Sequence, residues 1–159
     1  MKDSFKGLEE TLDGSKLRVA VIVSRFNDEI TTRMLGGATE CMRTHNVPED
    51  KIMIMSVPGA FELPLAALHV AETEDYDALV CLGAVIRGET PHFDYVCSET
   101  SRGLMNVQLT TGVPIGFGLL TLETVQQGVE RTEPGKHNKG FEAAEAALEM
   151  ALHVKTITS

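Results

Sequence analysis

Four short segments of the sequence hold side chains suited to binding a small molecule and moving a proton. They span residues 24–27, 58–62, 87–92 and 121–123, and each follows a largely apolar run. Phe26 offers a flat face on which an aromatic ring can stack, or else it packs the corner between two elements. Glu62 either accepts hydrogen bonds from a polyol or is a first-turn acid favoured by the helix dipole. Both alternatives stay open for each residue, whereas Asn27 is expected to cap a helix.

The segment 87–92 is the most informative, because it combines free backbone N–H groups with an imidazole. N–H groups that precede a helix bind anions, and histidine exchanges protons near neutral pH. His92 is therefore a candidate for proton transfer, although a lone histidine is more often structural or solvent-exposed. Asp94 is not expected to assist it, since residues i and i+2 do not share a helix face. The other histidines, expected to be solvated, are His45, His69, His137 and His153.

Cations gather in the stretch 131–140, between two expected helices. This stretch is either an exposed turn with C-terminal caps or, through Arg131, a site that captures phosphate. The second alternative rests on the guanidinium fork, which matches two phosphate oxygens. The motifs of nucleotide hydrolysis, dinucleotide redox chemistry, zinc proteolysis and serine hydrolysis are absent.

These segments lie between strands and helices that alternate along the chain. Apolar runs predict strands over 17–23, 51–57, 78–86 and 114–120, and helical spacing predicts helices over 27–45, 61–72, 92–110, 124–131 and 140–154. Such units in series imply an α/β fold in which a four-stranded parallel sheet carries helices on both faces. Ligands bind at the carboxyl ends of its strands. The residues expected to face inward are Ile30, Met34, Ala38, Met42, Phe93, Val96, Thr100, Leu104, Val107, Phe141, Ala144, Leu148 and Ala151.

Two local features of the expected helices have a specific explanation. Pro64 fits a first helical turn, where its missing N–H is not needed. Gly36 and Gly37 lie inside a helix, where each costs about 1 kcal/mol relative to alanine. We therefore expect a neighbouring element to pack closely against this pair.

Length and composition narrow the class of protein. The 159 residues suit a single domain, with residues 1–16 as an N-terminal arm. A formal net charge of −9 disfavours nucleic acid and anionic membranes as partners. No apolar run is long enough for a membrane span or the core of a signal peptide. Because Cys41, Cys81 and Cys97 are odd in number and widely spaced, we expect buried free thiols in a reducing cytoplasm.

Five segments that follow one another in the expected order resemble the lumazine synthase family of riboflavin biosynthesis, and the resemblance extends over about residues 8–154. The segments are Ser24-Arg25-Phe26-Asn27 and residues 58–64, 83–96, 116–121 and 138–140. The resemblance implies a doubly wound, flavodoxin-like fold of three layers. It implies a transferase that joins 5-amino-6-(D-ribitylamino)uracil to 3,4-dihydroxy-2-butanone 4-phosphate through an imine. Phosphate and water leave, 6,7-dimethyl-8-ribityllumazine forms, and neither a metal nor an organic cofactor is required.

The resemblance also implies a role for each matching residue. His92 would transfer protons, and the backbone of Glu89 and Thr90 would bind the phosphate together with Arg131. Three of the residues, Phe117, Arg131 and Lys139, would come from an adjacent subunit. The pyrimidine and ribityl group would contact Phe26, Ala60, Phe61, Glu62, Ala84, Val85, Ile86, Phe117 and Lys139.

The family resemblance further implies self-association and a partner protein. Homopentamers are expected, in which the segment 4–12 adds a strand to a neighbour's sheet, and they assemble in some members into an icosahedral capsid of about 60 subunits. Riboflavin synthase is the expected partner. Two features depart from the family's pattern. Glu89 stands where a small residue is common, so its acid group is expected to point away from the phosphate. Residues 132–137 differ from the common loop but keep its length.

Rival hypotheses make different demands on the same residues. A non-catalytic flavin- or lumazine-binding protein needs Phe26 and Glu62 but not His92 with Arg131. A shell protein with a vestigial pocket would assemble without turnover. A flavodoxin-like signalling domain needs an acidic phosphoacceptor after a strand, where this sequence has Phe26 or Pro58. The joint presence of His92 and Arg131 favours the enzyme.

Overall fold

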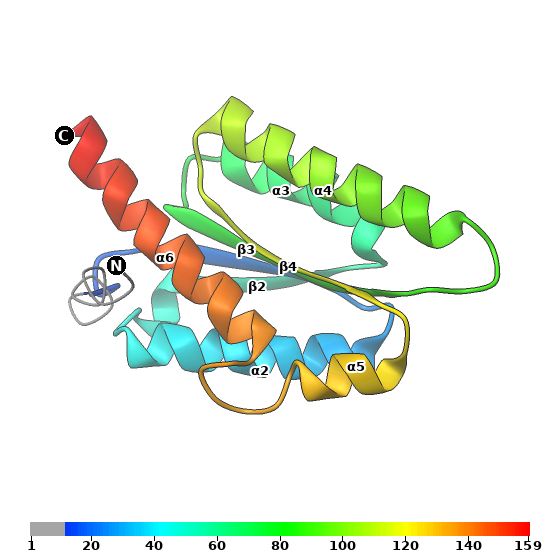
Figure 1. Cartoon of the computed structure of the whole chain (residues 1–159). Coiled ribbons are helices and arrows are strands. Elements are labelled where there is room, and N and C mark those ends of the chain that lie inside the picture. Colours follow the sequence, from blue (N-terminus) through cyan, green and yellow to red (C-terminus); the bar gives the residue numbers. More distant parts are fainter. Residues whose placement is uncertain (1–11) are drawn as a thin grey trace, which may run out of the picture.

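The computed structural model describes residues 12–159. Strands β1 (Val19–Ser24), β2 (Ile52–Val57), β3 (Ala78–Ile86) and β4 (Ile115–Leu122) form a parallel sheet in the order β2-β1-β3-β4. Helices α2 (Asp28–Thr44), α5 (Val125–Glu130) and α6 (Lys139–Thr158) cover one face, and α3 (Leu63–Glu72) and α4 (His92–Thr111) cover the other (Figure 1). The turns η2 (Glu49–Lys51) and η3 (Ala60–Glu62) precede β2 and α3. The predicted doubly wound, flavodoxin-like fold is confirmed.

The predicted element boundaries lie within one residue of the observed ones except at four ends. Strand β1 and helix α3 each begin two residues later than predicted, at Val19 and Leu63. Strand β4 continues to Leu122 because Thr121 and Leu122 pair with Val85 and Ile86 of β3, a contact that local sequence does not reveal. Helix α6 continues past the predicted residue 154 to Thr158, since the last residues include neither glycine nor proline. Pro64 lies in the first turn of α3, as predicted.

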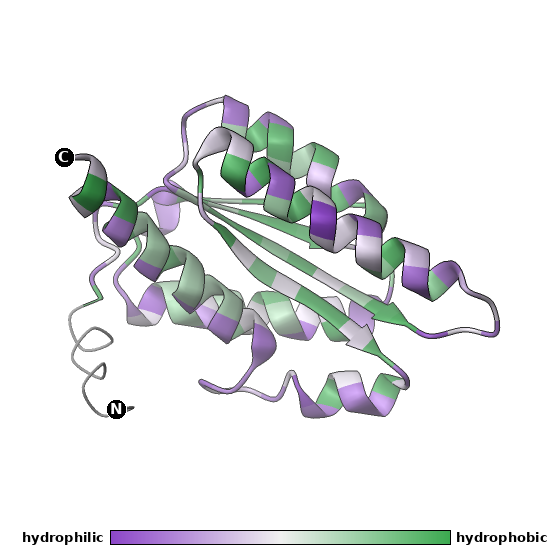
Figure 2. Cartoon of the chain, turned by 45° about the horizontal axis from the view of Figure 1, so that its top comes forward, coloured by the Kyte–Doolittle hydropathy of each residue, from purple (hydrophilic) through white to green (hydrophobic). Residues whose placement is uncertain are grey.

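Alternation along the strands divides the apolar side chains between two cores. On β1, Val19 and Val21 face the core beneath α2 and α6, whereas Ala20 and Ile22 face the core beneath α3 and α4. Figure 2 shows hydrophobic residues along the strands and hydrophilic ones over much of the outer helix surface. The predicted inward residues of α2, α4 and α6 are buried, apart from Val96, which is half-buried. The periodicity of the sequence therefore identified the core correctly.

Two predictions about single side chains are wrong. His45 is not solvated: its side chain is 11% exposed, Nε2 lies 3.3 Å from Oε2 of Glu145, and Nδ1 lies 3.2 Å from the Leu12 carbonyl oxygen. Because Glu145 is on α6, this contact depends on the packing of α2 against α6 and not on local sequence. Cys97 is half-buried, whereas Cys41 and Cys81 are buried as predicted, and all three thiols are free.

Predictions for the start of the chain fall mainly outside the described residues. The segment 4–12, expected to add a strand to a neighbour, reaches the described part only at Leu12. Within residues 12–159, every helix is too short or too polar to cross a lipid bilayer.

Asn138 ties the start of α6 to α2 and to the preceding loop. Its buried side chain accepts hydrogen bonds from the N–H groups of Gly140 and Phe141 through Oδ1, which caps α6. Its Nδ2 donates to the carbonyl oxygens of Arg33 and Thr132. A Cβ on Gly37 would overlap this amide, whereas a Cβ on Gly36 would meet open space. The close packing predicted for the glycine pair is therefore found at Gly37 alone.

We expect opposite effects from alanine at these adjacent positions. Both substitutions improve helix propensity by up to about 1 kcal/mol, so Gly36→Ala should raise the free energy of unfolding by up to that amount. Gly37→Ala forces the Asn138 cap to move and should lower the free energy of unfolding by about 1–3 kcal/mol. Urea unfolding at one fixed protein concentration measures both. Equal changes in the two variants would contradict this account.

Candidate active site

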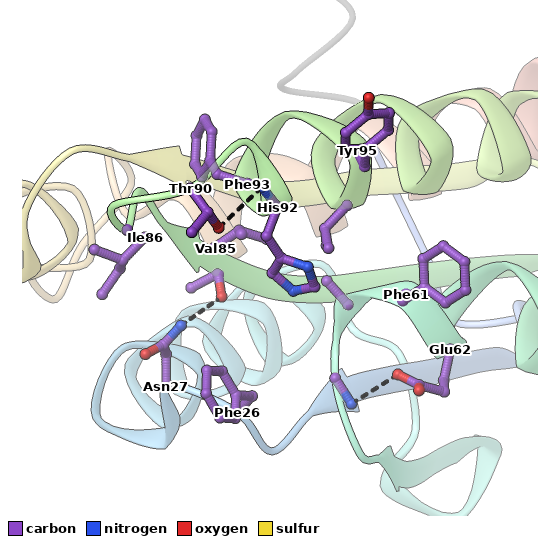
Figure 3. Close-up of a pocket in the computed structure, with 15 residues that line it drawn as sticks. Phe26, Asn27, Phe61, Glu62, Val85, Ile86, Thr90, His92, Phe93 and Tyr95 are labelled. Carbon is purple, nitrogen blue, oxygen red and sulfur yellow. Dashed lines mark hydrogen bonds between the residues drawn. The ribbon is translucent and has the colours of Figure 1, made fainter.

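A pocket with a volume of about 560 Å³ opens at the carboxyl ends of the central strands. This volume lies within the range of small-molecule sites. The pocket occupies the place where the neighbouring strands β1 and β3 send their chains to opposite faces of the sheet, the expected ligand position in this fold. Its lining residues are Phe26, Asn27, Gly59, Ala60, Phe61, Glu62, Ala84, Val85, Ile86, Gly88, Thr90, His92, Phe93, Tyr95 and Val96 (Figure 3).

The turn after β1 holds Phe26 out of the core. The N–H groups of Arg25 and Phe26 donate to the carbonyl oxygens of Val57 and Pro58, at 2.9 and 3.0 Å, which continues the pairing of β1 with β2. Phe26 is 72% exposed, and Phe61, on the opposite side of the pocket, is 60% exposed (Figure 3). Of the two roles considered for Phe26, the structure excludes corner packing and leaves its face free for a ring.

Asn27 occupies the predicted cap position of α2 but does not cap the helix. Its backbone is left-handed, with φ 63° and ψ 48°, and its side chain accepts no hydrogen bond from the helix. Instead Nδ2 donates to the carbonyl oxygen of Ala84 at 2.8 Å. This hydrogen bond joins the turn after β1 to the end of β3, so the predicted cap is in fact a brace across the pocket.

Glu62 ends η3, the turn that leads into α3. Its Oε2 accepts a hydrogen bond from the Gly59 N–H at 3.1 Å, which fixes the carboxylate at the pocket wall (Figure 3). The side chain is exposed. Oε1 faces no hydrogen-bond donor within residues 12–159, so the carboxylate keeps an acceptor for the hydroxyl groups of a ligand.

His92 begins α4, and its imidazole points into the pocket between α4 and η3 (Figure 3). Its backbone N–H donates to Oγ1 of Thr90 at 3.4 Å, a local contact that helps to start the helix. Gly88 and Thr90 line the pocket, whereas Glu89 is exposed and does not. The single imidazole of the pocket therefore lies beside a stretch of backbone that precedes a helix.

The cations and the aromatic ring predicted from an adjacent subunit lie together elsewhere on the surface. The Lys139 N–H donates to the Arg131 carbonyl oxygen at 3.0 Å, and Lys139 shares a shallow hollow on β4 and α6 with Phe117, which is 53% exposed. None of the three lines the pocket of its own chain, and no lysine or arginine of residues 12–159 does. The structure thus divides the predicted site between two separate surfaces.

Several lining residues were not predicted as site residues. Tyr95 and Val96 follow His92 by three and four positions, so helical spacing alone places them on its face. Three more, Phe93, Gly59 and Gly88, are next to predicted residues in the sequence, so they could have been predicted by including those neighbours. Asn27 was assigned only a capping role, and nothing in the local sequence reveals its bond to Ala84.

Comparison with protein families identifies the family of the chain. The model of the 6,7-dimethyl-8-ribityllumazine synthase family matches residues 16–155. The chain belongs to this family. Lumazine synthases are enzymes of riboflavin biosynthesis. Membership of this family supports the prediction that the chain is a transferase-type enzyme that binds small-molecule substrates and self-associates. The resemblance inferred from five segments is confirmed over nearly the whole chain.

Outside this pocket, three potential metal ligands meet between α2 and α6. The donor atoms of Cys41, His45 and Glu145 lie within 4.8 Å of one another. Burial, reinforced by the carboxylates of Glu145 and Glu40, raises the pKa of the Cys41 thiol to about 12. The thiol is therefore protonated at neutral pH, and His45 and Glu145 bond to each other. The cluster as it stands is a contact between two helices.

The cysteines should differ sharply in reactivity. Burial also raises the pKa of Cys81 to about 12, so neither Cys41 nor Cys81 forms the reactive thiolate until the pH approaches that value. Burial and the Asp94 carboxylate raise the pKa of Cys97 too, but this thiol is half-exposed. At pH 8 a disulfide reagent should modify Cys97 alone in the folded protein and all three thiols after unfolding. Folded Cys97→Ser protein that still reacts rapidly would contradict this expectation.

Proposed function

We propose that the protein is a 6,7-dimethyl-8-ribityllumazine synthase. It condenses 5-amino-6-(D-ribitylamino)uracil with 3,4-dihydroxy-2-butanone 4-phosphate and releases phosphate and water. The observation that carries this proposal is a single pocket in which exposed aromatic faces, a carboxylate and an imidazole converge at the carboxyl ends of β1 and β3.

The aminouracil half of the reaction suits the walls formed by η3, β3 and the turn after β1. Phe26 stacks on the pyrimidine, and the backbone of residues 84–86 contacts its polar edge. Ala60 and Phe61 line the space beside it, and Glu62 accepts hydrogen bonds from the ribityl hydroxyl groups. The fixed carboxylate and the exposed ring of Phe26 support these assignments.

The phosphate half needs donors that the pocket of one chain supplies only in part. The N–H groups of Glu89 and Thr90 precede α4 and bind the phosphate, while the exposed Glu89 carboxylate points away from it. Arg131 of an adjacent copy supplies the positive charge, together with Lys139 and Phe117 of that copy. The absence of cations from the pocket within residues 12–159, and the clustering of these three residues on another surface, support a site shared between copies.

The chemistry requires proton transfers more than a strong nucleophile. The aromatic amine attacks the ketone to form an imine with loss of water. Removal of a proton and loss of phosphate leave an enol, which takes up a proton and becomes a carbonyl. The second nitrogen attacks this carbonyl and closes the ring with loss of water. His92 accepts and returns these protons, a role that contributes about 10²–10⁴-fold to a rate. Holding two small reactants together contributes at least as much. This sequence calls on neither a metal nor an organic cofactor.

The direct test supplies both substrates and follows the absorbance of the lumazine product. Turnover supports the proposal. Binding of both substrates without turnover would favour a non-catalytic binding protein or a shell with a vestigial pocket. Native mass measurement beside the assay reports whether the active form is a pentamer or a larger shell.

Replacing the imidazole should slow the reaction without abolishing it. We expect His92→Ala to lower kcat by about 10²–10⁴-fold, because substrate alignment remains while proton transfer passes to water. KM should change little. A loss beyond about 10⁴-fold would contradict this division between alignment and proton transfer.

Removing the cation that is proposed to bind the phosphate should weaken the binding of mainly one substrate. We expect Arg131→Ala to weaken the binding of the butanone phosphate by about 1.5–3 kcal/mol, the range for a hydrogen bond to a charged group. The aminouracil should bind as before. Lys136→Ala, which removes a cation from the same exposed loop, is the matched control. An unchanged KM for the phosphate substrate would refute the role of Arg131.

Mixing two impaired variants tests whether copies share a site. If His92 and Arg131 of one site come from different chains, mixed oligomers of His92→Ala and Arg131→Ala regain sites with both residues intact. Random assembly restores roughly a quarter of the sites. Joint refolding of the variants, followed by the assay, measures this recovery. Activity that stays at the average of the separate variants would place both residues in one chain's pocket.

A further inference from the structure

Arg87 joins three elements at the edge of the pocket. Its backbone N–H donates to the Leu122 carbonyl oxygen at 2.8 Å, which extends the pairing of β3 with β4. Its Nε donates to Oε1 of Glu123, just after β4, at 3.1 Å, and Nη2 lies 3.3 Å from Oδ1 of Asp94 in the first turn of α4. The two carboxylates therefore occupy two sides of the guanidinium fork.

The same guanidinium also lies over an aromatic ring. Its Cζ is 4.3 Å from the centroid of the Phe93 ring, a cation–π geometry. Phe93 is buried and lines the pocket next to His92. Arg87 thus holds both residues that directly follow His92 and fixes them to the ends of two strands.

The loop between Arg87 and α4 has few other attachments. Within residues 12–159, the hydrogen bonds of residues 88–91 are local, and they run from His92 to Thr90 and from Asp94 and Tyr95 to Pro91. Figure 1 shows this loop extending beyond the sheet before the chain turns back into α4. Among the hydrogen bonds and ion pairs of residues 12–159, the guanidinium of Arg87 is therefore the polar side-chain link between the first turn of α4 and the sheet.

The imidazole of His92 depends on this link. Within residues 12–159 its ring nitrogens make no hydrogen bond, so no polar contact holds the ring itself and its position depends on the backbone of the first turn of α4. That turn is held by Asp94 and Phe93 through Arg87. A shift of about 1 Å in a proton-transferring group can cost about 10²-fold in rate.

We propose that Arg87 is a positioning residue that acts through His92. It sets the place of the imidazole without touching the substrates, since both arms of its fork are bound to carboxylates. This inference rests on the proposed function, because its main readout is turnover of the two substrates.

The first test compares Arg87→Gln with a control substitution on α4, the helix that Arg87 holds. Arg102 pairs with Glu99 within α4, so Arg102→Gln removes an exposed arginine without releasing the loop. We expect Arg87→Gln to lower kcat by about 10–100-fold with both KM values within about threefold, and Arg102→Gln to change neither. Arg87→Lys should resemble Arg87→Gln, because an ammonium cannot replace the two-armed fork. Full activity in Arg87→Lys, or a raised KM for the phosphate substrate at unchanged kcat, would overturn the proposal.

The second test asks whether Arg87 acts through the imidazole. Added to His92→Ala, the Arg87→Gln change should lower the remaining rate by less than about threefold, because coupled residues are not additive. An equal loss in both backgrounds would mean general damage to the pocket and would refute positioning of His92. Asp94→Asn and Glu123→Gln, which each release one arm, should give smaller losses with the same dependence on His92. These two variants replace Arg87→Gln in the test if Arg87→Gln fails to fold.

A readout without substrates separates this inference from the proposed function. Hydrogen exchange of the amides in residues 92–97 should be faster in Arg87→Gln than in the parent protein, and unchanged in Arg102→Gln. Unchanged hydrogen exchange in Arg87→Gln would overturn the positioning role of Arg87, whatever the activity. A parent protein that fails to turn over both substrates would instead overturn the proposed function.

Discussion

The side-by-side pairing of β1 with β3 is the constraint on which the pocket depends. From these neighbours the chain leaves toward opposite faces, to α2 after β1 and to α4 after β3, so no connection covers the ends of the strands. The hydrogen bond from Asn27 to Ala84 braces this opening. Phe26 and His92, more than sixty positions apart in the sequence, therefore face one space. The order of the strands creates the pocket, and the loops supply side chains that line it.

Sequence periodicity was sufficient for the layers and for much of the pocket. Strand β3 and the buried faces of α2 and α6 follow from apolar spacing, and strand ends identify Phe26, Glu62 and His92 as neighbours. What escaped prediction rests on contacts between distant segments. His45 is buried because Glu145 lies on a helix packed against its own. Arg87 can bond to Glu123 only because β4 ends beside β3. Local propensity carries no information about such pairs.

Charge explains how an acidic protein can still bind a phosphate. Several cations of the chain are paired with its own acids: Arg33 with Glu133, Arg102 with Glu99, and Lys155 with Asp77. A net charge of −9 raises the cost of bringing in an anion, and within residues 12–159 the pocket of one chain offers the anion amides but no lysine or arginine. Under the proposed function, phosphate binding and self-association are therefore linked, since the missing charge arrives with a neighbour.

The loop that departs from the family's pattern shows why this link tolerates sequence change. Thr132 and Asn138 are buried at its two ends, with Thr132 bonded to Arg33 and Gly128, while residues 133–137 are largely exposed. The hydrogen bond from the Lys139 N–H to the Arg131 carbonyl oxygen closes the loop at its base. Substitutions in the exposed middle leave this base in place. Under the proposed function, Arg131 and Lys139 can therefore be presented together to a neighbour while the exposed residues 133–137 vary.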